Sequence, residues 1–502
     1  MESSLELREK TILAENGATG IRQLISIQYV MSAVCCFLFL TSAFANNPIP
    51  TVVGPPVPQA VVPGGGEFTL TVYGANFVSG AVVNWNRSPR STTFVSAREL
   101  KAQILASDVA TATAGYITVS NPPPGGGVSS SSYGLVEVHT PTATIVADTP
   151  NVYLEGGAAQ FLLPTDFNND GILDFAASWG SEIQVLLGNG DGTFRFGSFA
   201  THSYYPSSAI AYGDFNNDGN EDLVFGAEPD GPPTQLKVAL GDGNGKFRQG
   251  PQFGNFTIYP FQIVVGDFNR DGSLDLAASE RGSYVFLGTG DGTFRQRDHY
   301  NKVGSGGAIA TADFNGDGIL DLLVGYYGFD IMLGNGDGTF QKPRTALRFN
   351  KQINNCSFGA GFVVTDFNAD GIPDLAFCET DYPLNKGKIW IALGNGDGTF
   401  QKPTSLTVHP YQGIFSFAAG DFNSDGKTDL IANYFTSGRG DKSETDLFLG
   451  NGDGTFQARK IINLPGQPYN AEDGIVPADF NSDGLLDFIY QAPGEVDVFV
   501  QK

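Results

Sequence analysis

Side-chain oxygens recur at fixed spacing in a nine-residue pattern, Asp-Phe-Asn-x-Asp-Gly-x-x-Asp, which the chain repeats seven times. Oxygen-bearing side chains stand at positions 1, 3, 5 and 9 of every copy. Calcium takes about six to eight oxygen ligands and tolerates irregular geometry. A main-chain carbonyl at position 7 and one or two waters would complete such a shell. The pattern therefore predicts up to seven structural calcium ions.

The predicted calcium ligands form one set for each position that supplies an oxygen. The first-position aspartates are Asp166, Asp214, Asp267, Asp313, Asp366, Asp421 and Asp479. The third-position asparagines are Asn168, Asn216, Asn269, Asn315, Asn368, Asn423 and Asn481. The fifth-position aspartates are Asp170, Asp218, Asp271, Asp317, Asp370, Asp425 and Asp483. The main-chain ligands at position 7 belong to Ile172, Asn220, Ser273, Ile319, Ile372, Lys427 and Leu485. The ninth-position aspartates are Asp174, Asp222, Asp275, Asp321, Asp374, Asp429 and Asp487.

The remaining fixed residues of the pattern predict how its loop is built. Position 6 is glycine, as at Gly171, because the chain must turn sharply after the third ligand. Position 2 is phenylalanine, as at Phe167, which lies between two ligands and should face a core. An EF-hand is excluded, since position 12 of the first copy is Ala177 instead of glutamate and the flanks read as strands. We therefore expect each loop to join two antiparallel strands.

The alternative is a set of hairpin turns without metal, because Asp and Asn favour turns in any case. The charge of the chain favours the metal. The formal net charge is −24, and 21 of the 53 acidic residues are aspartates of the pattern. Carboxylates packed together without a counter-charge repel one another.

A second motif, Gly-Asn-Gly-Asp-Gly-Thr-Phe, alternates with the first. It ends at Phe194, Phe340, Phe400 and Phe456, with variants ending at Phe247 and Phe294. Asn-Gly and Asp-Gly flanked by apolar runs predict a tight hairpin turn with a core phenylalanine, and a second ion site is the alternative. One unit then holds four antiparallel strands, which make one propeller blade. The seventh unit lacks its outer strand, and residues 142–146 are predicted to supply it and close the ring.

Residues 48–138 differ in composition, with few charges and many Pro, Gly, Val and Thr. Alternating strands separated by turn clusters predict a small β-sandwich there. The predicted fold is therefore all-β: a seven-bladed β-propeller over residues 142–502, preceded by a small immunoglobulin-like β-sandwich.

The seven loops and their order resemble the FG-GAP/VCBS repeats of the integrin alpha-subunit N-terminal β-propeller over residues 142–502. The resemblance implies a calcium-stabilised propeller whose ligands are the residues of positions 1, 3, 5 and 9. Two departures stand out: asparagine replaces aspartate at position 3, and every unit carries a loop. Residues Gly74, Ala75, Asn76 and Phe77 resemble the Gly-x-Asn-Phe turn of IPT/TIG domains, which implies a spacer or docking module.

The N-terminal 45 residues read as a signal peptide or an uncleaved anchor with an atypical, partly acidic start. An apolar run over residues 24–45 ends in Ala43-Phe44-Ala45, which fits a signal-peptidase site. We expect a secreted or envelope-exposed monomer, held at a membrane only if this run is not cleaved.

Two cysteines, Cys356 and Cys378, follow the predicted leader. If Asp366 and Asp374 close the hairpin, Cys378 faces Phe362, and Cys356 lies about 20 Å further along the strand. A disulfide needs Cα atoms within about 7 Å, so both thiols are predicted to be unpaired unless the preceding segment folds back.

Nothing in the sequence identifies a catalytic site. The four histidines, at positions 139, 202, 299 and 409, belong to no metal or nucleophile motif. The acidity argues against nucleic acid. We expect a non-catalytic protein that binds extracellular proteins or glycans. The alternatives are a lectin with pockets between blades and a polysaccharide lyase or hydrolase.

Two further features bear on the ligand. Exposed aromatic residues are predicted at one mouth of the ring, at Tyr204, Tyr205, Tyr326, Tyr327, Tyr382, Tyr411 and Tyr434. The tripeptide Arg439-Gly440-Asp441 matches an adhesion motif and is interpreted as coincidence.

Overall fold

The computed structural model describes residues 46–129, 134–142, 145–154, 159–179, 182–202, 206–227, 234–256, 260–280, 282–301, 308–325, 328–348, 362–381, 386–408, 412–436, 443–462, 464, 473–492 and 495–502. Asn46–Lys502 form one compact unit. The predicted leader over residues 1–45 lies outside the described residues. Within those ranges, no helix is long and apolar enough to cross a bilayer.

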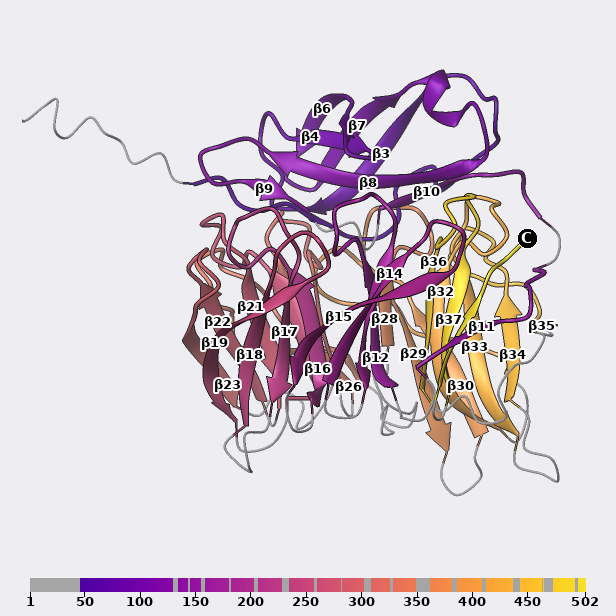
Figure 1. The fold of residues 1–502 in the computed structure, drawn as a ribbon. Coiled ribbons are helices and arrows are strands. Elements are labelled where there is room, and N and C mark those ends of the chain that lie inside the picture. Colours follow the sequence, from indigo (N-terminus) through magenta and orange to yellow (C-terminus); the bar gives the residue numbers. More distant parts are fainter. Residues whose placement is uncertain are drawn as a thin grey trace, which may run out of the picture. The chain divides into compact units, whose positions relative to one another are not determined.

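Seven four-stranded antiparallel sheets form the larger part of the chain (Figure 1). Sheet 1 contains β12 (Ala159–Thr165), β13 (Asp174–Trp179), β14 (Glu182–Gly188) and β15 (Phe194–His202). Sheet 2 contains β16 (Pro206–Gly213), β17 (Asp222–Ala227), β18 (Thr234–Gly241) and β19 (Phe247–Phe256). Sheet 3 contains β20 (Gln262–Gly266), β21 (Asp275–Ser279), β22 (Gly282–Gly288) and β23 (Phe294–Asn301). Sheet 4 contains β24 (Ala308–Ala312), β25 (Asp321–Gly325), β26 (Gly328–Met332) and β27 (Arg344–Arg348). Sheet 5 contains β28 (Phe362–Thr365), β29 (Asp374–Asp381), β30 (Lys386–Ala392) and β31 (Thr404–Leu406). Sheet 6 contains β32 (Gln412–Gly420), β33 (Asp429–Thr436), β34 (Ser443–Phe448) and β35 (Lys460–Ile462). Sheet 7 contains β36 (Asp473–Ala478), β37 (Asp487–Ala492), β38 (Glu495–Phe499) and β11 (Asn151–Tyr153).

Each nine-residue pattern joins the first two strands of one sheet, as predicted, and the seven segments are called loops 1 to 7 in chain order. In loop 1, Thr165 pairs with Asp174 across the hairpin. The position-6 glycines are left-handed in every loop, with φ between +78° and +90°. The position-2 phenylalanines are at most 2 % exposed. Both predictions about these residues are confirmed.

The two repeated motifs meet between neighbouring sheets. The ring of Phe167 in loop 1 packs edge-to-face on Phe247, which ends the Asp-Gly turn of sheet 2, with ring centroids 5.7 Å apart. The main-chain carbonyl of Phe167 also accepts a hydrogen bond from the N–H of Gly245 in that turn. The same edge-to-face contact recurs in the pairs Phe215–Phe294, Phe268–Phe340, Phe314–Phe400, Phe367–Phe456 and Phe480–Phe194. The last pair joins sheet 7 to sheet 1.

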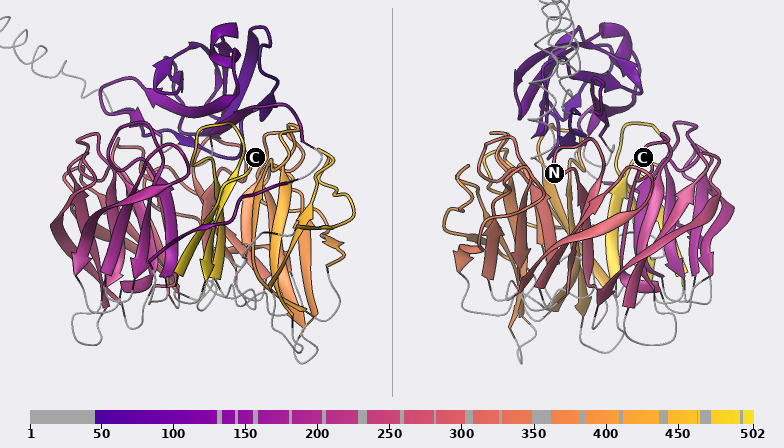
Figure 2. Two further views of the ribbon diagram at one scale, coloured as in Figure 1. Left: turned by 45° about the vertical axis from the view of Figure 1, so that its right-hand side comes forward. Right: turned by 90° about the vertical axis from the view of Figure 1, so that its left-hand side faces the viewer.

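The sheets surround a common cavity of about 590 Å³. Their first strands line it and pack on one another, β12 on β16, β16 on β20, β20 on β24, β28 on β32, β32 on β36, and β36 on β12. One lining residue from each sheet is Leu163, Ala211, Val264, Ala310, Val364, Phe417 or Val476. This repeated arrangement of four-stranded sheets fits a β-propeller (Figure 2).

An N-terminal strand completes sheet 7, but its position was predicted wrongly. The strand is β11, which pairs Asn151 with Val498 and Tyr153 with Val496, instead of residues 142–146. Ala147 bridges to Gln501, which lies two residues beyond the end of β38 at Phe499. Because the pairing is antiparallel, the residues that pair with β38 itself must follow Ala147 in the chain. The apolar pattern of residues 142–146 does not show whether that segment or the following one, β11, pairs with β38.

Two further sheets precede the seven. The first contains β1 (Thr51–Val52), β3 (Phe68–Ala75), β7 (Glu99–Ile104) and β6 (Ser91–Ser96). The second contains β2 (Ala60–Val61), β10 (Leu135–Val138), β8 (Thr113–Asn121), β4 (Val82–Trp85) and β5 (Ser88–Pro89), with β9 (Gly127–Val128) paired to β8. A short 3-10 helix, η1 (Ala106–Val109), follows β7. The two sheets share one hydrophobic core that includes Leu70, Val83 and Ile117. The described residues from 46 to 138, which contain these two sheets, are called the N-terminal module.

The predicted free thiol at Cys378 is wrong. Cys378 is disulfide-bonded and fully buried, and its partner lies outside the described residues. The hairpin register also differs by one residue, since Thr365 pairs with Asp374 and Phe362 with Phe377. The 20 Å separation extended the strand rise backwards from Phe362, the first described residue of β28, into residues that lie outside the described ranges.

The pairing of β11 with β38 predicts a new covalent closure. In the double variant Asn151→Cys/Val498→Cys, the two residues are direct cross-strand partners, about 5 Å apart at Cα, so a disulfide should form on oxidation. It should raise the thermal midpoint by closing a long loop, which non-reducing mass spectrometry and calorimetry would check. The control pair Asn151→Cys/Glu495→Cys is out of register and should stay reduced.

Candidate metal centres

The first three side-chain ligands of each loop converge on shared main-chain N–H groups. In loop 2, the N–H of Asp218 donates to both Asp214 Oδ1 (3.0 Å) and Asn216 Oδ1 (2.9 Å). Asp214 Oδ2 accepts from the N–H of Gly219 (2.8 Å), and Asp218 Oδ1 accepts from the N–H of Asn220 (3.0 Å). All four bonds recur in the other six loops. Positions 1, 3 and 5 are therefore brought together in every loop.

A second left-handed residue in each loop was not predicted. Position 4 has φ between +56° and +79° in all seven loops. Its occupants are Asn169, Asn217, Arg270, Gly316, Ala369, Ser424 and Ser482. A left-handed backbone favours glycine or asparagine, and the mixture of residue types at this position concealed the signal.

The ninth-position aspartate has a structural role that the ligand prediction missed. Asp222 is fully buried, and its Oδ2 accepts the N–H of Phe215 (3.0 Å) while its Oδ1 accepts the N–H of Gly241 (2.7 Å) at the end of β18. Equivalent bonds occur in every sheet, at 2.9–3.1 Å to the phenylalanine and 2.7–2.9 Å to the residue that follows the third strand. This carboxylate ties the loop to the neighbouring strand.

Burial raises the pKa of these carboxylates, because it disfavours their charged form. Burial raises the pKa of Asp174 to about 7, against the opposing main-chain hydrogen bonds, and Asp166 and Asp170 add to the rise. The pKa is raised to about 7 or 8 at the equivalent Asp222, Asp275, Asp321, Asp374 and Asp429, with burial the main cause. Burial also raises the pKa of the first-position Asp421 and Asp479 to about 7. A bound cation would favour the charged forms of all of them.

The residues fit calcium by chemistry, but the three aspartates of each loop are not grouped around one point. In the described part of the chain, no three His, Cys, Asp or Glu side chains converge closely enough to hold a metal ion. Positions 1, 3 and 5 gather their oxygens, whereas both oxygens of position 9 accept main-chain hydrogen bonds. Each carboxylate oxygen has a second lone pair, so position 9 could still serve a cation.

In the Asp-Gly turn of the second motif, the aspartate carboxylate accepts hydrogen bonds from within the turn itself. Asp191 Oδ1 accepts from the N–H (3.0 Å) and the hydroxyl (2.5 Å) of Thr193, and these bonds lower the pKa of the exposed Asp191. Gly190 and Gly192 are both left-handed. This geometry agrees with the predicted tight turn.

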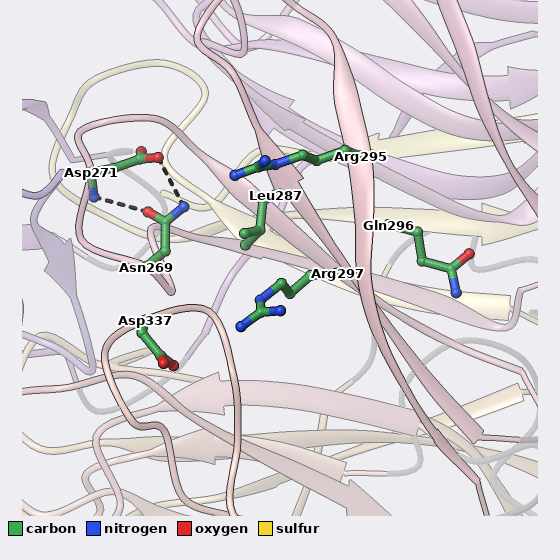
Figure 3. Close-up of a pocket in the computed structure, with 7 residues that line it drawn as sticks. All are labelled: Asn269, Asp271, Leu287, Arg295, Gln296, Arg297 and Asp337. Carbon is green, nitrogen blue, oxygen red and sulfur yellow. Dashed lines mark hydrogen bonds between the residues drawn. The ribbon is translucent and has the colours of Figure 1, made fainter. Parts of the chain in front are cut away.

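A surface groove of about 550 Å³ lies between sheets 3 and 4 (Figure 3). Loop 3 contributes Asn269 and Asp271, and the Asp-Gly turn of sheet 4 contributes Asp337. The remaining lining residues are Leu287, Arg295, Gln296 and Arg297. Both arginines come from the exposed outer strand β23, and the Arg297 guanidinium extends towards Asp337 (Figure 3). The groove therefore places two arginines beside two aspartates.

The predicted aromatic cluster is not supported where it can be examined. Tyr434 is fully buried on β33, so its prediction as an exposed residue is wrong, because it lies on the core face of that strand. The other predicted tyrosines, the tripeptide at residues 439–441 and His409 lie outside the described residues. His299 stacks on Tyr284 with ring centroids 3.9 Å apart, and a ring nitrogen of His139 lies 2.8 Å from the carbonyl oxygen of Thr140.

A family model for the FG-GAP-like repeat matches residues 166–225, 214–278, 276–324, 366–432 and 434–490, which together make up more than half of the chain. No curated protein sequence matches. Among solved structures, BBS1N in complex with ARL6DN is 11% identical with a TM-score of 0.45, covering 71% of this chain and 96% of that chain. An auxiliary nutrient binding protein from Bacteroides ovatus is 10% identical with a TM-score of 0.33, covering 90% and 98%.

The distinct roles of positions 5 and 9 in loop 2 predict that substitution lowers the free energy of unfolding much more at position 9 than at position 5. In EDTA, Asp222→Asn should lower the free energy of unfolding by about 2–3 kcal/mol, because its amide nitrogen faces a buried N–H donor. Asp218→Asn, at an exposed position, should change it by less than about 0.5 kcal/mol. Urea unfolding of both variants measures the difference, and equal losses would contradict the structural role of Asp222.

Proposed function

Since the chain belongs to the FG-GAP-like repeat family, we propose that residues 142–502 form a closed seven-bladed β-propeller that binds proteins or glycans without catalysis. The observation that carries this proposal is the set of seven four-stranded sheets around one cavity. The contact of Phe480 in loop 7 with Phe194 in sheet 1 supports closure of the ring. A propeller leaves only short, protected sheet edges and offers its surface for binding.

The second part of the proposal is that calcium ions occupy the Asp loops and stabilise the ring. Three observations support it: the oxygens of positions 1, 3 and 5 gather in every loop, the ninth-position carboxylates are buried, and burial raises the pKa of these buried groups, as at Asp222. For a dissociation constant of about 0.1 mM and about 1 mM calcium, each site would contribute about 1.4 kcal/mol. Calcium in this role is structural.

The N-terminal module is proposed to be an immunoglobulin-like domain of the IPT/TIG kind that serves as a spacer or docking module. Its two sheets around one core and the left-handed Asn76 directly after β3 support this assignment. We further propose secretion or exposure on the cell envelope, where millimolar calcium and a disulfide at Cys378 are both compatible with the surroundings.

The groove between sheets 3 and 4 favours an acidic ligand. Arginine pairs carboxylates through a planar fork of N–H donors, and both Arg295 and Arg297, on strand β23, line this groove. A uronate-bearing glycan matches this chemistry.

Calcium removal tests the stabilising role. EDTA should lower the thermal midpoint of unfolding, and added calcium should restore it, because several sites at about 1.4 kcal/mol each together approach the stability of a whole domain. Scanning calorimetry measures the midpoint, with magnesium as the control cation, since it demands a stricter octahedral geometry. An unchanged midpoint would mean that the loops are metal-free turns.

The binding proposal predicts retention on acidic polysaccharides. The protein should bind a uronate polymer more tightly than a neutral glycan of the same length, and Arg295→Gln/Arg297→Gln should reduce that binding at least tenfold. Arg248→Gln is a matched control, because Arg248 follows the turn phenylalanine of sheet 2 as Arg295 does in sheet 3 and lies outside the groove. A glycan array reports the preference, and release of unsaturated products would instead indicate a lyase.

A further inference from the structure

The N-terminal module contacts the Asp loops directly. Hydrogen bonds or ion pairs between described residues join it to loops 1, 3, 4, 5, 6 and 7. The partners differ in charge. Main-chain and neutral groups reach loops 3 and 7, the Glu137 carboxylate reaches Ser424 of loop 6, and arginine side chains reach loops 1, 4 and 5. The loops are therefore similar in sequence but unequal in surroundings.

Arg98 supplies a positive charge to loop 4. Its Nε lies 3.2 Å from Oδ2 of Asp313, the first-position aspartate, which is only 2 % exposed. A second bond, from Arg98 Nη2 to the carbonyl oxygen of Gly371 at 2.7 Å, fixes the guanidinium between loops 4 and 5. Asp313 Oδ2 also accepts the N–H of Gly318, so one oxygen carries both a main-chain hydrogen bond and the ion pair with Arg98.

Arg87 makes the corresponding contact with loop 1. Its Nη2 donates to Oδ2 of the first-position Asp166, and its Nη1 donates to the carbonyl oxygen of Asn169 at 2.8 Å. Asp166 Oδ2 also accepts the N–H of Gly171. The first-position carboxylate of loop 1 therefore has the same two kinds of partner as that of loop 4.

Among the described residues, no arginine or lysine contacts the first-position carboxylate of another loop. In loop 3, the second partner of Asp267 Oδ2 is the neutral N–H of Ile49. In loop 6, Lys427 lies 3.8 Å from the fifth-position Asp425 and not at the first-position Asp421. Loop 6 also faces the buried Glu137, whose carboxyl group accepts the hydroxyl of Ser424.

We propose that Arg87 and Arg98 act as built-in cations for loops 1 and 4, so that these two loops bind calcium far more weakly than loops 2, 3, 5, 6 and 7. The inference rests on the proposed calcium role of the loops. An arginine at the first-position carboxylate repels calcium and holds the oxygen that calcium would take. The module would then set the calcium stoichiometry at five ions and remain docked through the two loops that hold arginine.

Native mass spectrometry of the purified protein, titrated with calcium, counts the ions. The wild type should take five, and Arg87→Gln/Arg98→Gln should take seven. The charge-preserving variant Arg87→Lys/Arg98→Lys should stay at five. Lys101→Gln, which removes a positive charge of the module that pairs with Glu99 away from the loops, should also stay at five.

Single-loop variants locate the ions without disturbing the module. Asp218→Asn in loop 2 should lower the wild-type count by one, whereas Asp317→Asn at the same position of loop 4 should leave it unchanged. Seven ions in the wild type, or a lost ion in Asp317→Asn, would overturn the role of the arginines and leave calcium binding intact. No ion at any loop would overturn the proposed calcium role itself.

Discussion

The phenylalanine at position 2 of each loop is the point on which the sheet assembly depends. Its N–H donates to the buried ninth-position carboxylate of its own sheet, as Phe215 does to Asp222. In loops 1 to 5, its carbonyl accepts a glycine N–H from the next sheet, as Phe215 does from Gly292. Its ring packs against the turn phenylalanine of that sheet, Phe294. One residue thus links the loop, its own sheet and the neighbouring sheet.

This arrangement explains why two different motifs alternate along the chain. The Asp-Gly turn provides the glycine N–H and the phenylalanine ring that the preceding loop requires. Sheet 7 has no such turn, and the contact changes accordingly. Phe422 of loop 6 stacks on Phe488, and the side-chain amide of Gln501 donates to its carbonyl at 3.2 Å. The C-terminal residues therefore replace the missing turn.

The sequence was sufficient where local chemistry determines the structure. Side-chain oxygens, the position-6 glycine and the buried phenylalanine follow from the pattern alone, and the hairpins around it were predicted correctly. It was insufficient where a contact spans distant segments. The choice of β11 over residues 142–146 and the contact of Arg98 with Asp313 each depend on a partner far away in the chain. The left-handed residue at position 4 was hidden for another reason, because its occupants range from Gly316 to Arg270.

The unequal surroundings of the loops follow from the same constraint. The aspartates of the seven loops repel one another, and positive charge reduces this repulsion. Each further calcium ion would be attracted less strongly as the net charge of −24 is neutralised. A docking module with only neutral contacts would gain little binding energy from the negative charge of the loops. Arginines in the module convert part of the negative charge into an attachment, through a charge-assisted hydrogen bond at Asp166 and an ion pair at Asp313, which is shielded from water. On the proposed role of calcium, the acidic loops would serve two purposes, holding the ion in some sheets and the N-terminal module in others.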